Sequence, residues 1–244
     1  MAQQRKSKRP AKKRTQKKKP PPWRIAWRWF WRVVWAIPVV VLLWIAALSY
    51  FEPPKTFYMV KEEQRLGKTV KHVWVDIEDV APVMARSVAA AEDANFCRHW
   101  GIDMGALRQA IEDGGNRGAS TISQQVVKNV FLWHGRSYPR KALEALLTPV
   151  VEILWSKKRI MEVYLNVAEF DEGVFGVGAA SRHYFGVSAG QLSPTQAARL
   201  AAILPSPKTR SAKNPGAFTR KKAQTVIDGA ATIRADGRAD CFAD

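Results

Sequence analysis

The sequence is poor in the residues that build metal and redox centres. It has two cysteines, Cys97 and Cys241, in 244 residues, and its four histidines are scattered along the chain. No C-x-x-C or H-E-x-x-H pattern occurs, which argues against a structural zinc site. Nothing in the spacing of the two cysteines supports a disulfide, and we expect two unpaired thiols.

Acidic residues are missing from the first 32 residues. That segment carries 13 of the 39 lysines and arginines, whereas the rest of the chain holds 26 bases against 21 acids. Most of the formal charge of +18 therefore belongs to a tail with too few apolar residues to fold alone. We expect residues 1–32 to be a disordered basic cytoplasmic tail that ends at a membrane interface.

Charge is also absent from residues 33–51, VVWAIPVVVLLWIAALSYF. A helix of this length spans roughly 28 Å, which matches the hydrocarbon thickness of a bilayer. The stretch predicts a single transmembrane helix, and the tryptophans before it predict an interfacial belt. The positive-inside rule then places the basic tail in the cytoplasm and the remaining chain outside it. A cleaved signal peptide is the competing interpretation, but no small-residue cleavage site follows.

Beyond the anchor, helical patterns dominate. Residues 52–80 read as a connecting segment, in which TFYMV and VKHVWV favour brief extended runs. Residues 81–228 read as one mainly α domain, and nothing between residues 80 and 210 demands a sheet. The last stretch, residues 229–244, is polar and small and is expected to fray.

Capping patterns mark three helix starts, at Thr121 with Gln124, at Ser156, and at Ser193 with Gln196. On the first of these helices, Lys128 shares one face with Thr121 and Gln124. Hydroxyl, amide and ammonium groups on one face suit substrate binding, although a solvated amphipathic face gives the same pattern.

Carboxylates and cations occur together at two places in the chain. The stretch AEDANFCRHWGID puts Glu92 and Asp93 after an alanine-rich run, and Glu144 follows Arg140 and Lys141. Carboxylates act as general acid and base at glycosidic centres. Positioned cations stabilise a diphosphate that leaves with its charge. The combination indicates a membrane-anchored enzyme that moves a sugar off a diphosphate.

The chain resembles the peptidoglycan glycosyltransferases, carbohydrate-active family fifty-one. The resemblance covers about residues 52–210 and is carried by four motifs in the family's order, EDANFCRHWG, GASTISQQVVKN, RKALE and SKKRIMEVYLN. It implies a lysozyme-like, two-lobed α fold. It also implies polymerisation of lipid II into β-1,4-linked glycan, with release of undecaprenyl diphosphate, at the bacterial inner membrane.

The resemblance gives each matched residue a role. Glu92 matches the catalytic base that takes a proton from the acceptor 4-hydroxyl, and partial burial after an apolar helix would raise its proton affinity. Glu144 matches the second family carboxylate, which supports the leaving side. The remaining matched positions hold the diphosphate or shape the substrate site: Ser120, Thr121, Gln124, Gln125, Lys128, Asn129, Arg136, Arg140 and Lys141. His99 is expected to be a structural hydrogen-bonding residue.

The resemblance also bounds cofactors and partners. No cofactor is required, and a divalent cation, Mg²⁺ or Mn²⁺, is left open at the diphosphate. The expected partners are lipid II, the lipid-linked growing glycan and the membrane, with cell division or elongation proteins as candidates and no nucleic acid. The chain has no S-x-x-K or K-T-G pattern, so we expect no transpeptidase activity. Asp171 stands where the family commonly has glycine, which leaves that turn's geometry open.

Two alternatives from other classes remain open. A muramidase or lytic transglycosylase would also place a catalytic glutamate in a lysozyme-like domain, but would leave the cations unexplained. A membrane scaffold or nucleic-acid binder would use the basic tail, whose position the anchor already explains. A further hypothesis is that segment 130–155, with Phe131, Leu132 and Trp133, docks on the membrane.

Overall fold

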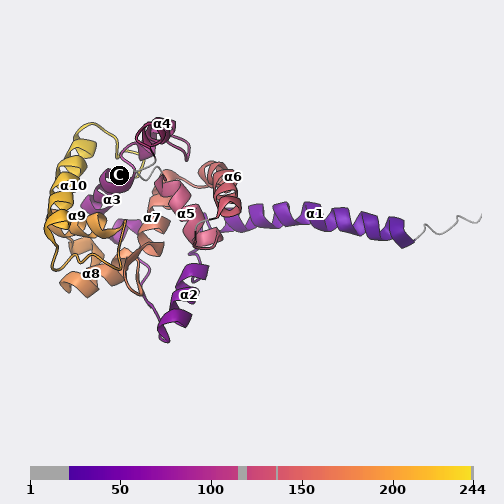
Figure 1. The fold of residues 1–244 in the computed structure, drawn as a ribbon, viewed down its shortest axis with the longest axis horizontal. Coiled ribbons are helices and arrows are strands. Elements are labelled where there is room, and N and C mark those ends of the chain that lie inside the picture. Colours follow the sequence, from indigo (N-terminus) through magenta and orange to yellow (C-terminus); the bar gives the residue numbers. More distant parts are fainter. Residues whose placement is uncertain (1–21, 115–119, 136, 243–244) are drawn as a thin grey trace, which may run out of the picture. The chain divides into compact units, whose positions relative to one another are not determined.

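The computed structural model describes residues 22–114, 120–135 and 137–242 (Figure 1). Helices make up most of these residues, which confirms the mainly α class predicted from the sequence. The chain divides into two compact units, Met1–Leu43 and Trp44–Asp244. The predicted disorder of residues 1–32 is wrong for residues 22–32, which are helical, while residues 1–21 lie outside the described residues.

The first unit contains most of α1 (Pro22–Ala47), a 26-residue helix that includes Pro38. By length and composition α1 is able to cross a membrane, with a mean hydropathy of 2.1 over its most apolar window. Its tryptophans are exposed, including Trp23 and Trp35. The predicted span overlaps α1, but its last four residues lie beyond the helix end.

The chain leaves α1 through a turn that Arg159 caps. The Arg159 guanidinium donates to the carbonyl oxygen of Leu48 at 3.1 Å and to that of Phe51 at 2.5 Å. The indole N–H of Trp155 donates to the carbonyl oxygen of Ile45 at 2.7 Å. These donors satisfy carbonyls that a longer helix would have paired with its own backbone, so the helix ends earlier than predicted.

The connecting segment contains a helix, α2 (Phe57–Leu66), so the prediction of an extended run at TFYMV is wrong. The hydroxyl of Thr56 accepts a hydrogen bond from the backbone N–H of Met59 at 3.2 Å, and Gly67 ends the helix in the left-handed conformation. Met59 is buried in the core. The cap and the buried methionine favour a helix over the extended alternative.

A small three-stranded sheet follows, in the order β1-β3-β2. β1 (Lys71–His72) pairs in parallel with β3 (Val174–Phe175), which pairs in antiparallel fashion with β2 (Glu169–Asp171). β1 confirms part of the extended run predicted at VKHVWV, whereas β2 and β3 were not expected. At the turn after β2, Asp171 accepts a hydrogen bond from the N–H of Glu172 at 2.8 Å. A local hydrogen bond thus accommodates Asp171 in this turn.

The helices of the second unit form two groups. In the first, α3 (Pro82–Glu92), α9 (Pro194–Ile203) and α10 (Ala217–Ala235) pack on one another, as Figure 1 shows. In the second, α5 (Ile122–Phe131) packs on α6 (Tyr138–Leu154) and α7 (Lys157–Val167). The shorter helices are α4 (Met104–Glu112) and α8 (Val177–Phe185), with 3₁₀ turns at Ile77–Asp79, Phe96–Arg98 and Ala189–Gln191.

Local capping chemistry sets several of these helix starts, as the sequence predicted. Thr121 with Gln124 and Ser193 with Gln196 form capping boxes, and the Ser156 hydroxyl accepts from the N–H of Arg159. These side chains satisfy N–H groups that have no partner within the helix. Capping thereby fixes where α5, α7 and α9 begin.

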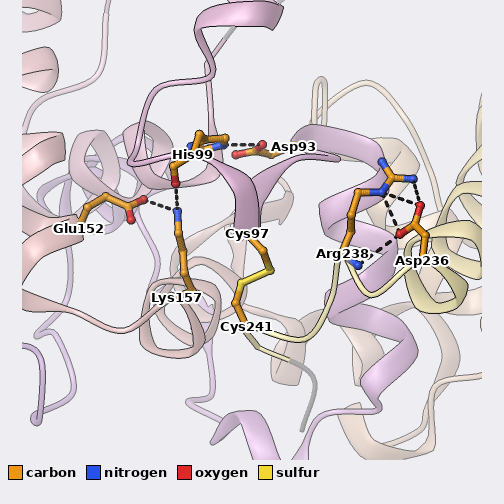
Figure 2. Close-up of a disulfide and its surroundings, with 8 residues drawn as sticks. All are labelled: Asp93, Cys97, His99, Glu152, Lys157, Asp236, Arg238 and Cys241. Atoms are coloured by element: carbon orange, nitrogen blue, oxygen red, sulfur yellow. Dashed lines mark hydrogen bonds and ion pairs between the residues drawn. A yellow bond between two sulfur atoms is a disulfide. The ribbon is translucent and has the colours of Figure 1, made fainter.

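A disulfide joins Cys97 to Cys241, so the expectation of two unpaired thiols is wrong (Figure 2). The two cysteines are 144 residues apart in sequence. They meet because the chain folds back after α10 and places Phe242 against Phe96, with ring centroids 5.9 Å apart. Only the fold brings these residues together, which is why their spacing gave no signal.

The predicted fraying of residues 229–244 is also wrong as far as Phe242. α10 continues to Ala235, and both Ala239 and Phe242 are buried. The domain boundary drawn after residue 228 therefore falls inside a helix. Apolar burial and the disulfide fix this segment despite its polar composition.

Candidate active site

The carboxylate of Glu92 lies at the C-terminal end of α3 and is partly buried. Its Oε2 accepts a hydrogen bond from Nε2 of Gln125 on α5, at 2.9 Å. Burial raises the pKa of Glu92, while the Gln125 hydrogen bond and the charges of Lys222 and Lys128 oppose the rise. A carboxylate with raised proton affinity, held by one neutral donor, has the properties of a general base.

Asp93, the neighbouring acid, ties the first motif to α5. Its buried carboxylate accepts from the backbone N–H of Ile122 at 3.0 Å, and Nε2 of His99 lies 2.9 Å from its other oxygen. Figure 2 shows this contact, and below it Nζ of Lys157, which donates to the carbonyl oxygen of His99 at 2.8 Å. Both carboxylate oxygens of Asp93 are therefore engaged in contacts that hold the first motif against α5. His99 is hydrogen-bonded, as predicted.

The glycine that ends the first motif, Gly101, lets the backbone pass close to the side chain of Thr148 on α6. Gly101 has a φ of +82°, and a Cβ there would lie 2.5 Å from Cγ2 of Thr148. Its carbonyl oxygen accepts from the hydroxyl of Thr121 at 2.5 Å. Thr121 and Gln124 are both buried, and their capping contacts hold the start of α5. Their predicted contact with substrate stays a prediction.

Lys128 connects the base to the cations of α6 electrostatically. Burial lowers the pKa of Lys128, and the charges of Arg140 and Lys141 lower it further. The carboxylates of Glu144 and Glu92 act in the opposite direction. Because all four groups affect its titration, Lys128 lies within electrostatic reach of both Glu92 and the α6 cluster.

The cations of α6 converge on one buried carboxylate. Glu144, whose residue is 2% exposed, accepts from Nη1 of Arg140 at 2.6 Å and from Nζ of Lys141. Nζ of Lys141 also donates to the hydroxyl of Ser120 at 3.2 Å. The network fixes two cations near Lys128 and links α6 to the residue before the α5 cap. Arg136, also predicted to hold the diphosphate, lies outside the described residues.

Predicted site residues line two hollows. The first, about 220 Å³, is lined by Glu92, Ser120 and other residues around the end of α3. The second, about 170 Å³, is lined by Gln125, Lys128 and Asn129. Glu92 lines the first hollow and Lys128 the second, and the hydrogen bond from Gln125 of the second hollow to Glu92 of the first links the two.

A wider hollow of about 740 Å³ lies elsewhere and is lined by Trp74, Asp79 and Arg182 among other residues. None of the predicted site residues lines it. The volume of a hollow therefore does not by itself identify the candidate active site in this molecule.

Sequence reasoning missed the residues that complete the second hollow. Tyr58 comes from α2, His134 from the loop after α5, and Glu169 from β2. Tyr58 stands in the segment read as a connector, and no local pattern relates it to Glu169. Lys222 of α10, whose charge affects the pKa of Glu92, likewise had no local signal.

One group of side chains in the described ranges brings potential metal ligands together. Asp93, His99 and Asp103 each place a ligand atom within 4.8 Å of the others. The carboxylate of Asp103, however, already accepts from Nδ2 of Asn95 at 3.1 Å and from the N–H of Ala106 at 2.9 Å. With the Asp93 oxygens also engaged, the group fits a hydrogen-bonded network better than a metal site.

The chemistry that this arrangement supports has two parts. A partly buried carboxylate can take a proton at one end of the site, and a group of cations can stabilise departing negative charge at the other. Both parts come from α3, α5 and α6, which the hydrogen bonds described above join to one another.

Comparison with known proteins gives a consistent result. The transglycosylase family model matches residues 60–231. A biosynthetic peptidoglycan transglycosylase of Jannaschia sp. (strain CCS1) is 58% identical over 204 residues, covering 84% of this chain and 85% of the relative. That of Caulobacter vibrioides is 46% identical over 209 residues, covering 84% and 89%. That of Pseudomonas fluorescens (strain SBW25) is 45% identical over 208 residues, covering 82% and 87%.

Proposed function

The chain belongs to the transglycosylase family, and on that premise we propose that it polymerises lipid II into β-1,4-linked glycan strands during peptidoglycan synthesis. The observation that carries the proposal is that a partly buried glutamate, Glu92, and a cation, Lys128, are linked through Gln125, which donates to Glu92 at 2.9 Å and lines the hollow of Lys128. One group suits removal of a proton, and the other suits binding of a diphosphate.

In the proposed reaction, Glu92 takes the proton from the 4-hydroxyl of the acceptor lipid II as that oxygen attacks the anomeric carbon of the donor. The glycosidic bond forms as the bond to the diphosphate breaks, and attack from the opposite face inverts the anomeric centre. Undecaprenyl diphosphate leaves, and Lys128, Arg140 and Lys141 stabilise its charge. Glu144 is buried between two of these cations and would act by positioning them.

The lytic alternative finds less support in the site. A muramidase of the common two-carboxylate type needs a second carboxylate that activates water or attacks the sugar. Among the described residues, Asp93 is engaged by His99 and the α5 backbone, and Glu144 is engaged by two cations. Neither is available for that role without breaking these contacts.

Purified protein supplied with lipid II separates the two functions. The proposal predicts that glycan polymer accumulates and that finished glycan strands keep their length. Shortening of finished strands without polymerisation of lipid II would instead support the lytic alternative.

We further propose that α1 is a single-pass anchor with the basic tail in the cytoplasm and the catalytic unit in the periplasm. The basic residues before α1 support this orientation, and so does the Cys97–Cys241 disulfide, because disulfides persist in oxidising compartments. Alkaline phosphatase fused after residue 244 should be active. A fluorescent cytoplasmic reporter that matures there would contradict the orientation.

The exposed apolar side chains of α6 support docking of the catalytic unit on the membrane. Tyr138, Leu146 and Ile153 are 95%, 68% and 73% exposed. Leu132, which the sequence suggested for this role, is buried and belongs to the core. Replacing Leu146 and Ile153 by serine in a chain that begins at residue 44 should weaken flotation with liposomes, and unchanged flotation would count against docking.

Any divalent cation, Mg²⁺ or Mn²⁺, would on this proposal arrive with the diphosphate. The cations Lys128, Arg140 and Lys141 already supply positive charge to that part of the site. Activity should then survive removal of metal from the protein by a chelator, provided that the chelator is removed before substrate is added.

A further inference from the structure

His134 lines the second hollow, yet the proposed reaction does not use it. It lies in the loop between α5 and α6, and its ring shares the hollow of about 170 Å³ with Lys128, Asn129 and Gln125. A ligand that contacts Lys128 from this hollow would therefore also meet the imidazole ring.

A stacking contact holds the ring in one orientation. The imidazole lies on the phenol ring of Tyr58, with centroids 3.6 Å apart and an angle of 17° between the planes. Tyr58 is itself fixed, because its hydroxyl donates to Oε2 of Glu169 at 2.6 Å. The imidazole is thus positioned before any substrate arrives, which lowers the entropy cost of a contact with a ligand.

The two ring nitrogens have different surroundings. Nδ1 of His134 is buried and has no hydrogen-bond partner among the described residues. Nε2 is not buried in this way, so it is the nitrogen that a molecule in the hollow can reach. A proton on Nδ1 would be buried without an acceptor, which favours the neutral tautomer that carries its proton on Nε2.

The charges around the ring also favour its neutral form. Burial lowers the pKa of His134 to about 4, and the charges of Lys128, Arg140 and Lys208 act in the same direction. Glu62 opposes them, while Tyr58 stacks on the ring and its hydrogen-bond acceptor, Glu169, lines the same hollow. At neutral pH the free protein therefore presents a neutral N–H donor beside cations, which is a suitable setting for an anion.

We propose that His134 is a further substrate-binding residue, a neutral hydrogen-bond donor whose Nε2–H binds a phosphate oxygen of the diphosphate next to Lys128. The inference rests on the proposed function, since it assigns a ligand to the same site. A neutral donor adds directional binding where several positive charges already repel one another.

Three variants of the full chain in detergent test the assignment, with inorganic pyrophosphate as the probe. His134→Phe keeps an aromatic ring on Tyr58 and removes the donor, whereas His134→Gln places an amide N–H near the position of Nε2. Lys128→Met removes a cation that the proposed function itself requires. Binding is measured by calorimetric titration.

His134→Phe should weaken pyrophosphate binding by about tenfold or more, since hydrogen bonds to charged groups contribute about 1.5–3 kcal/mol. His134→Gln should retain most of the affinity. Pyrophosphate should also shift the Nε2–H resonance of His134 in the ¹⁵N NMR spectrum of labelled protein. Wild-type affinity of His134→Phe, or an unshifted resonance, would overturn the proposal.

The Lys128→Met variant separates this inference from its premise. If Lys128→Met loses pyrophosphate binding while His134→Phe keeps it, the role of His134 is wrong and the diphosphate site stands. If Lys128→Met binds pyrophosphate as well as the wild type does, the diphosphate site itself is wrong, and the inference falls with it.

Discussion

Opposing effects act on the carboxyl group of Glu92, and their balance governs its use as a base. Burial raises its pKa, whereas Gln125 and the nearby lysines stabilise the charged form. A general base acts only when deprotonated. Because its folded-state pKa lies above the ordinary value for glutamate, activity should be lost at a higher pH on acidification than for an exposed glutamate.

Replacing Gln125 tests this balance directly. Gln125→Met removes the hydrogen bond that favours the charged carboxylate, so the pKa of Glu92 should rise further. The acid limb of the kcat/KM profile for lipid II should move to higher pH. Gln224→Met, at an exposed position of α10, is the control and should leave the limb in place. A limb that stays fixed or moves to lower pH in Gln125→Met would contradict the assignment.

Glu144 offers a residue-scale test of stability. Glu144→Gln leaves Arg140 and Lys141 without their shared carboxylate in a region that also holds Lys128. Loss of one partner from a buried ion pair costs about 3–5 kcal/mol, and the exposure of Lys141 places this case near about 3 kcal/mol. Chemical denaturation measures the change.

An exposed carboxylate provides the matched control for Glu144. Glu172→Gln breaks an ion pair with Arg65 in which both side chains are about half exposed. It should cost less than about 1 kcal/mol. If both variants lost the same free energy of unfolding, burial of the Glu144 network would add no stability beyond that of an exposed ion pair.

At the scale of elements, the sequence predicted best where the determinants are local. The starts of α5, α7 and α9 depend on side chains within three residues of the cap, and all were predicted. The strands β2 and β3 are only three and two residues long, so alternation could not reveal them, whereas β1 lies within the predicted run VKHVWV. α2 was missed because the Thr56 cap stands within a run that also resembles a strand.

The same distinction applies to the site. Glu92, Lys128, Arg140 and Glu144 were found through motifs, and the structure brings Lys128 within electrostatic reach of the other three. Tyr58 and His134 meet only through the packing of α2 against α5 and the loop that follows it. Contacts between segments that are distant in the sequence leave no local pattern, so the sequence could not predict that Tyr58 and His134 line the second hollow.

Asn166 at the end of α7 shows how one side chain joins two elements. Its Nδ2 donates to the carbonyl oxygen of Val75 at 2.8 Å, and its Oδ1 accepts from the Val75 N–H at 2.9 Å. Asn166→Ala leaves both backbone groups without partners and should cost about 1–3 kcal/mol by chemical denaturation. Asn166→Asp keeps the acceptor but loses the donor, and should also destabilise. A neutral result for both would show that water replaces the side chain.

At the scale of the whole molecule, the disulfide connects the last residues of the chain to the first motif. Besides Cys97–Cys241, Figure 2 shows the ion pair between Arg238 and Asp236. The guanidinium of Arg238 also donates to the carbonyl oxygen of Ala94 at 3.4 Å. The C-terminal segment therefore covers the loop that follows Glu92. The disulfide and the Arg238 contacts also explain why the polar residues that follow α10 are ordered as far as Phe242.

Removing the disulfide should lower both stability and activity. The double variant Cys97→Ala with Cys241→Ala frees a long loop and should lose about 2–4 kcal/mol of unfolding free energy, measured by chemical denaturation. Lipid II polymerisation should fall when the wild type is reduced and recover on reoxidation. The double variant is the control, because a reductant should not change its activity. Full activity and stability of the reduced wild type would contradict a structural role for the bond.

The central claim is that a proton acceptor and a group of cations share one site in the catalytic unit. The most direct test is the initial rate of lipid II polymerisation by the wild type and Glu92→Gln, with Glu172→Gln as the carboxylate control. General-base catalysis contributes typically 10²–10⁴-fold, so Glu92→Gln should lose at least about a hundredfold in rate while Glu172→Gln stays near the wild type. Polymerisation by Glu92→Gln at the wild-type rate would contradict the account.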